Sequence, residues 1–419
     1  MDVPDAIQLM GDKQWQEIKS RLTGKFNKMM KGLFRQKGAQ LDINILASDE
    51  AQEFITTHAG ILDGGFQKVE MTDKMRERLT RSNYIFSGIK TFHELNEAFP
   101  SMLDENGNKK PFERFLNDVQ KINDTYNANY LHAEYNFVQA SATMAAKWEQ
   151  FSEDGDRYNL QYRTAKDDKV RPEHAALDGV TLPMSDSFWE TYYPPNGWNC
   201  RCTVVQVRKQ KYPATEHAEA MSRGEEAMNG ERYNIFRFNS GKQGKTMPDY
   251  NPYTIKRCND CDVAKGKLKL GFVPDYQLCQ GCIMIRKCSE DRNRDNSAKA
   301  TKKSPEVKKL QGTTISNPDF NHEVLVTGGS IREWTNQPHK EYAAKNSILK
   351  HIAKVFREAK YIGFIDNFKM KPGVKQSHLF ETNVLGELSW IIVREYEIGE
   401  FVLHSISDSD KIKTGIRKE

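Results

Sequence analysis

Apolar residues in the first third of the chain recur at the spacing of helical turns. Such spacing places apolar side chains on one face of a helix. Residues 112–146 are rich in alanine and aromatic residues and predict one or two long helices, which follow a polar turn at residues 103–110. We therefore expect a mostly helical region over residues 14–146. The positions that show the periodicity best are Met75, Leu79, Ile85 and Phe86.

The last hundred residues show a helical stripe followed by strand-like runs. Residues 339–359 carry apolar residues three or four positions apart, which predicts a helix. Four runs with strand character follow, and glycine and proline occupy the turns between them. We expect an α+β domain made of a helix and a four-stranded antiparallel sheet. The four runs are residues 361–368, 375–382, 388–396 and 400–407.

Two segments between these regions differ from them in composition. Residues 158–207 combine glycine and proline with tryptophan and tyrosine, which favours short strands and fixed loops. Residues 289–311 are polar and mainly basic. Because such a segment buries too little apolar surface to offset the entropy cost of ordering, it predicts a flexible linker.

Composition limits the class of protein. The 419 residues contain no apolar run long enough for a membrane span. The N-terminal residues lack a basic stretch followed by an apolar one, so we expect no secretory signal and an origin in a cytoplasm. The net charge of +5 is small for this length and does not by itself indicate a nucleic-acid partner.

The seven cysteines are more informative than the charge. An odd number without a secretory signal favours metal binding or burial over disulfide bonds. Cys258 and Cys261 form one C-x-x-C pair, and Cys279 and Cys282 form a second. Two such pairs suit tetrahedral coordination of zinc by four thiolates, which leaves no open position. A redox pair is the alternative, but no thioredoxin-like pattern surrounds either half. We predict a structural zinc site within residues 258–282.

One stretch in the middle of the chain, residues 162–205, resembles the signature of the Mu F-like head morphogenesis family, which are minor head proteins of tailed phages. The preceding segments YIFSGIKTF (84–92) and EYNFVQASATMAAKW (134–148) also resemble that family. The resemblance implies a protein held in few copies in the phage head near the portal, with a part in capsid assembly and DNA delivery. The residues that carry it include Arg163, Asp168, Arg171, His174, Asp178, Gly179, Trp189, Asn196, Trp198, Cys200 and Cys202.

The side chains of this stretch have two interpretations. His174, Asp178, Cys200 and Cys202 are all potential zinc ligands. However, the C-x-C pair lacks the two-residue spacing that is usual in structural zinc knuckles. We therefore favour buried cysteines, with His174 and Asp178 hydrogen-bonded to loop backbone.

The C-terminal domain resembles a second family, the phage branch of the barnase–EndoU–colicin–RelE-like nucleases, over residues 324–412. The segments that carry this resemblance are VTGGSIREWTNQPHKEYAAKNSILKHIAKVF (326–356), HLFET (378–382), SWIIVRE (389–395) and HSISDSD (404–410). It implies a toxin ribonuclease that needs no metal ion.

Metal-independent RNA cleavage uses the 2′-hydroxyl of the substrate as nucleophile and needs a base, an acid and a cation near the phosphate. His378 is the candidate acid or base, because imidazole titrates near neutrality. Lys345 is the candidate cation. Ser405 and Ser407 share one face of the last strand and are candidate phosphate ligands, with Asp408 orienting a partner. A structural explanation also exists for each: a core histidine, a solvated lysine and serines on the wet face.

The sequence thus predicts a phage minor head protein with a C-terminal ribonuclease effector. Expected partners are the portal and other capsid proteins, RNA, phage DNA and an immunity protein; expected locations are the virion head and the host cytoplasm. The alternatives are a purely structural head protein with an inactive C-terminal domain, and another toxin chemistry such as ADP-ribosyl transfer. The predicted divisions are a helical N-terminal region (1–83), a Mu F-like domain (84–210), a connecting region with the zinc segment (211–288), a basic linker (289–316) and a nuclease-like domain (317–419).

Overall fold

The computed structural model describes residues 11–257, 279–337, 339–367, 371–384 and 386–417. The chain forms two compact units, Met1–Ser289 and Glu290–Glu419. Among the described residues no helix has the length and apolar character needed to cross a bilayer.

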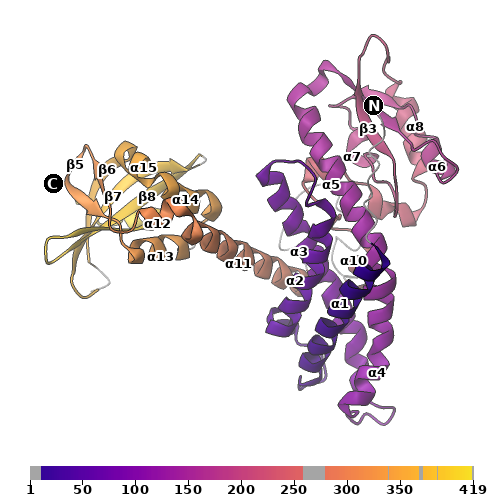
Figure 1. Ribbon diagram of the computed structural model, residues 1–419, viewed down its shortest axis with the longest axis horizontal. Helices are drawn as coiled ribbons and strands as arrows, with labels where there is room; N and C mark the ends of the chain where they lie inside the picture. Colours follow the sequence, from indigo (N-terminus) through magenta and orange to yellow (C-terminus); the bar gives the residue numbers. More distant parts are fainter. Residues whose placement is uncertain (1–10, 258–278, 338, 368–370, 385, 418–419) are drawn as a thin grey trace. The chain divides into compact units, whose positions relative to one another are not determined.

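Long helices build most of the first unit (Figure 1). Capping side chains define where two of them begin: Ser48 accepts a hydrogen bond from the Ala51 N–H, and Thr72 accepts one from the Met75 N–H. The helical region predicted from the apolar spacing is confirmed. The long helices are α1 (Asp12–Phe34), α2 (Asp49–Asp63), α3 (Asp73–Ala98), α4 (Phe112–Asn123) and α5 (Leu131–Asp154).

One hydrophobic core runs through this unit. It begins with Trp15 in α1 and extends to Ile285, and it includes residues from all five long helices. The boundary predicted between residues 83 and 84 lies in the middle of α3, and the helices on either side of it share this core. The N-terminal helices are therefore part of the same folded unit as the segment that follows.

A small antiparallel sheet follows α5. Its central strand β1 (Asn159–Arg163) pairs with β2 (Thr181–Pro183) on one side and β3 (Thr203–Val207) on the other. These strands confirm the short strands predicted over residues 158–207. Short helices occupy the connections and the residues after the sheet: α6 (Pro172–Ala175), α7 (Phe188–Thr191), α8 (His217–Ala227), α9 (Ser240–Gln243) and α10 (Pro252–Arg257).

The segment predicted to be a flexible linker is instead largely helical. Helix α11 spans Gln280–Lys303 and α12 spans Pro305–Lys309. The buried residues of α11 beyond the unit boundary, Ala298 and Thr301, are small and therefore leave no apolar stripe in the sequence. An ion pair between Arg294 and Asp291, three residues apart, adds support on the helix surface.

The second unit contains a six-stranded mixed sheet in its described residues, where the sequence predicts four strands. The predicted meander is present as β6 (Lys360–Asp366), β7 (Val374–Val384), β8 (Glu387–Tyr396) and β9 (Phe401–Ser407). Two further strands, β4 (Thr314–Asn317) and β5 (Phe320–Leu325), extend it, and β5 runs parallel to β9. The order across the sheet is β4-β5-β9-β8-β7-β6.

Helices of the second unit cover one face of this sheet. Phe356 packs on Phe380 with their ring centroids 4.6 Å apart, and Trp334 is fully buried in the same core. The helix predicted over residues 339–359 is divided in the structure into α14 (Tyr342–Ile348), a 3-10 turn and α15 (Ile352–Glu358). Helix α13 (Gly328–Asn336) precedes them and starts with a capping box between Thr327 and Ser330.

Candidate functional site

Two cysteines and a histidine converge beside the small sheet of the first unit. His174 lies in α6, a short helix that begins at Pro172, and Cys200 and Cys202 lie in the segment that leads into β3. The Nδ1 atom of His174 is 3.6 Å from the sulfur of Cys200 and 3.7 Å from the sulfur of Cys202. The three potential ligand atoms lie within 4.8 Å of one another, and all three residues are largely buried.

Asp178, the fourth ligand considered from the sequence, does not join this group. Its Oδ1 atom accepts hydrogen bonds from the Thr164 N–H at 2.8 Å and from the Thr164 hydroxyl at 3.1 Å. The expectation that Asp178 bonds to loop backbone is confirmed. His174, in contrast, directs Nδ1 toward the two sulfurs.

The loops that carry these ligands are held by several contacts. Arg171 donates to the carbonyl oxygen of Trp198 at 2.5 Å. Asn199 adopts a left-handed backbone conformation with φ of +55°, and its side-chain oxygen accepts a hydrogen bond from Asn136 of α5 at 3.0 Å. Asparagine tolerates this conformation better than most residues. Arg201 makes two charged hydrogen bonds with Asp167, of 2.5 and 2.6 Å.

Electrostatics at the cluster shift the pKa values of the two cysteines in opposite directions. The hydrogen bond from the Cys202 thiol and the neighbouring His174 ring hold the pKa of Cys200 well below its ordinary value. The same interaction with Cys200, together with burial, raises the pKa of Cys202. Two cysteine sulfurs beside an imidazole nitrogen are a soft donor set of the kind that metal ions use.

A cavity of about 570 Å³ adjoins the cluster, and His174, Cys200 and Cys202 are among its lining residues. Its other walls carry mostly basic and amide side chains. The residues that supply them are His132, Asn136, Lys169, Arg171, Asn199 and Arg201.

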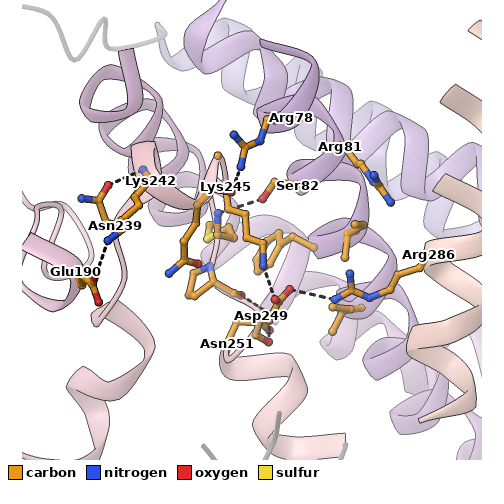
Figure 2. A pocket seen from close by; sticks show the side chains of 17 residues that line it. Arg78, Arg81, Ser82, Glu190, Asn239, Lys242, Lys245, Asp249, Asn251 and Arg286 are labelled. Atoms are coloured by element: carbon orange, nitrogen blue, oxygen red, sulfur yellow. Dashed lines mark hydrogen bonds and ion pairs between the residues drawn. The ribbon is translucent and has the colours of Figure 1, made fainter. Parts of the chain in front are cut away.

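A second cavity, of about 550 Å³, lies between α3, α9 and the first turns of α11 (Figure 2). Five of its lining residues are basic and two are acidic. Arg286 contacts Asp249 at 3.2 Å, and Lys245 also pairs with Asp249. Arg78 donates to the carbonyl oxygen of Gln243 at 2.6 Å. The lining thus carries more basic than acidic groups, and several of the basic ones are held by partners inside the cavity.

The predicted four-cysteine zinc site is only partly described. Cys258 and Cys261 lie outside the described residues. The sulfurs of Cys279 and Cys282 are 3.5 Å apart, which is far longer than a disulfide bond of about 2.05 Å. The zinc site formed by these four cysteines therefore stays a prediction.

In the second unit, His378 lies in a buried acid–base group. Its Nε2 atom is 3.0 Å from Glu395, and its Nδ1 atom is 2.9 Å from the hydroxyl of Tyr361. The Glu395 carboxylate also accepts hydrogen bonds from Lys375 and Gln376, each at 2.6 Å. Lys375 and His378 contribute to holding the pKa of Glu395 below its ordinary value, although burial acts in the opposite direction.

Lys345 is engaged elsewhere in that unit. Its amine lies 2.8 Å from Asp408, and its side chain is fully buried. In the sheet register, His378 is paired with Val393 of the neighbouring strand β8, and Val393 is paired with Leu403 of β9. Asp408 follows Leu403 by five residues and lies beyond the end of β9, so the carboxylate that holds Lys345 is several residues along the sheet from His378. The expected convergence of the two on one phosphate is not found.

The two serines lie on the opposite face of the sheet from His378. Ser405 is paired with Ile392, and Ser407 is paired with Trp390, so they share a face as predicted. Val393, the partner of His378, points to the other face because neighbouring strand residues alternate. The predicted catalytic set of His378, Lys345, Ser405 and Ser407 is therefore distributed over separate places.

Comparisons with known proteins divide the chain in the same way as its compact units. Residues 105–205 match the family model described as phage Mu protein F like protein. Residues 293–403 match the large polyvalent protein-associated domain 3, whose description names no nuclease. That second match begins within the predicted linker.

Two curated relatives match part of the chain. The chain is 36% identical over 104 residues to the putative capsid assembly protein F of Escherichia phage Mu, which is 25% of this chain and 21% of the relative. It is 25% identical over 198 residues to the Mu-like prophage FluMu F protein of Haemophilus influenzae, which is 46% of this chain and 42% of the relative. The matched segments thus span less than half of either relative, and no solved structure matches the chain. Residues 105–205, which hold the His174–Cys200–Cys202 cluster, are therefore the segment that is similar to the phage Mu protein F like family.

Proposed function

We propose that this chain takes part in assembling the capsid of a tailed phage. The observation that carries the proposal is the Mu F-like match over residues 105–205, supported by a relative named as a putative capsid assembly protein. That segment folds into one core with the helices before it, so the whole first unit is the part we assign to this role. The partners would be capsid and portal proteins, and the location would be the virion.

Purified particles test this proposal directly. A phage whose gene for this chain is deleted should yield fewer complete heads, and mass spectrometry of wild-type particles should detect the chain. A gene that ends after Ser289 is the matched control, since it keeps the first unit and should restore head assembly. Absence of the chain from particles, together with normal head yield after deletion, would contradict the proposal.

A second candidate function, RNA cleavage by the second unit, is supported by a single arrangement. An imidazole held between the Glu395 carboxylate and the Tyr361 hydroxyl resembles an acid–base pair. Two observations favour the alternative of an inactive structural domain: His378 is almost fully buried, and the Lys345 amine is paired with Asp408. The domain match does not name a nuclease either.

An RNA cleavage assay with the full chain in the presence of a chelator distinguishes a ribonuclease from an inactive structural domain. If the unit is a ribonuclease, labelled RNA should be cut by the wild type and left intact by His378→Ala. Ser407→Ala is the matched control and should keep the activity, because this serine lies on the other face of the sheet. If the wild-type chain leaves the RNA intact, the result would contradict ribonuclease activity and favour an inactive, structural second unit.

A further inference from the structure

The two sulfur–nitrogen distances within the His174–Cys200–Cys202 cluster match those of a tetrahedral metal site. Zinc binds cysteine sulfur at about 2.3 Å and histidine nitrogen at about 2.0–2.1 Å, with bonds near the tetrahedral angle. These values place a ligating sulfur and nitrogen about 3.6 Å apart. The two sulfur–nitrogen distances here are 3.6 and 3.7 Å.

We propose that the Mu F-like domain binds a zinc ion through Nδ1 of His174 and the sulfurs of Cys200 and Cys202. Thiolate and imidazole are the ligand types that zinc prefers in proteins. The three donor atoms lie within 4.8 Å of one another, close enough for a single ion to contact all of them. Cys200 is 5% exposed and His174 is 2% exposed, so water cannot fully solvate either group.

The ligands come from two structural elements that the surrounding contacts fix relative to each other. Arg171, directly before α6, bonds to the backbone of Trp198, two residues before Cys200. The Asn136–Asn199 bond ties the same loop to α5. Gly197 lies so close to Arg171 that a Cβ atom there would stand 2.8 Å from the guanidinium. Such ties hold the three donors in place before any ion binds.

Three protein ligands leave one position of tetrahedral zinc for water or a small ligand. The adjoining cavity of about 570 Å³ supplies room for it, and all three ligand residues line that cavity. Lys169, Arg171 and Arg201 also line the cavity, so an anionic ligand suits this position better than a cationic one. This site is separate in sequence from the predicted site of Cys258, Cys261, Cys279 and Cys282.

Metal analysis of the purified full chain tests the proposal. The double variant Cys200→Ser/Cys202→Ser should lose about one zinc ion per chain relative to the wild type, and His174→Asn should weaken binding at the same site. The matched control is Cys279→Ser/Cys282→Ser, which removes a second C-x-x-C pair and should leave this ion in place. Cobalt substitution should give the strong visible absorption of tetrahedral thiolate coordination, and the part that comes from this site should be lost in the first set of variants and kept in Cys279→Ser/Cys282→Ser.

A measurement on the wild-type chain covers the case in which these variants do not fold. Cys200 and Cys202 should resist alkylation in the zinc-loaded chain and react after treatment with a chelator, as read by mass spectrometry of their peptide. Equal zinc content and equal cobalt absorption in the wild type and the folded Cys200→Ser/Cys202→Ser variant would overturn the proposal. Alkylation that is unchanged by the chelator would overturn it as well.

Discussion

A buried ion pair lies between α2, α3 and α5 in the first unit. The amine of Lys90 contacts the Glu134 carboxylate at 2.7 Å, the carbonyl oxygen of Tyr126 at 2.6 Å and the His58 ring at 3.1 Å. The Tyr253 hydroxyl also donates to Glu134. Burial works against a charged Glu134, but Lys90 and His58 bring its pKa down to about 2. Burial and the charge of Lys90 bring the pKa of His58 down to about 4. The cluster is thus a lysine–carboxylate pair beside a neutral histidine.

Glu94 lies in the same region, but its pKa is shifted upward, whereas that of Glu134 is shifted downward. Burial raises its pKa from 4.5 to about 8, although Lys90 acts to lower it. The folded chain therefore keeps this carboxyl protonated up to about pH 8, while the unfolded chain ionises it near pH 4.5. A raised carboxyl pKa contributes stability that is complete below pH 4.5 and is lost as pH rises toward 8.

We predict that Glu94→Gln removes much of this pH dependence. At pH 7 the wild type has lost about 3 kcal/mol relative to pH 4.5, so the neutral glutamine should stabilise the fold by up to that order at pH 7 and by little at pH 5. Urea unfolding at both pH values measures the difference. Replacement of the exposed Glu153 by Gln is the control and should change the stability by little at either pH. Equal pH slopes for the wild type and Glu94→Gln would contradict the prediction.

The residue types of the His174–Cys200–Cys202 cluster were visible in the sequence, but their convergence was not. His174 precedes Cys200 by 26 positions, and its place beside the sulfurs depends on how the chain brings α6 next to the segment before β3. Spacing rules for zinc knuckles describe ligands that are close together in the sequence, so they cannot predict that His174 lies beside Cys200. The same limit applies to Lys345 and Asp408, since their ion pair joins residues 63 positions apart.

At the scale of elements, apolar periodicity predicted the helices and strands that bury large apolar side chains. The helices of the first unit and the β6–β9 meander follow that pattern and were predicted. Helix α11 was not predicted, because the residues that it buries beyond Ser289 are small and most of the others there are polar or charged. Strongly helix-forming Lys, Arg and Ala are as compatible with a solvated helix as with a linker, and composition does not distinguish the two.

The two strands that were missed, β4 and β5, are short and carry polar residues. In β5, Asn321, His322 and Glu323 are exposed in succession, so no regular alternation marks a strand. Its parallel pairing with β9 is also non-local, because the helices α13–α15 and three strands lie between them in the chain. A local pattern cannot indicate a partner that distant.

At the scale of the whole molecule, each compact unit has its own hydrophobic core. Within the described residues, the core of the first unit extends from Trp15 to Ile285, and that of the second from Val307 to Ile406. The two family matches fall in the same way, with residues 105–205 in the first unit and residues 293–403 in the second. The structure divides the chain after Ser289, and the two family matches lie on either side of that division.

From this division we predict that residues 290–419 fold alone. A core built entirely from residues of one unit should not need the other for its stability, so the fragment should unfold cooperatively and at the midpoint of one transition of the full chain. In the full chain, Phe380→Ala should lower that transition, since truncating a buried phenylalanine costs about 3–5 kcal/mol. Phe137→Ala, in the core of the first unit, should lower only the other transition. Differential scanning calorimetry measures both, and a single transition that shifts with either variant would show that the two units unfold as one.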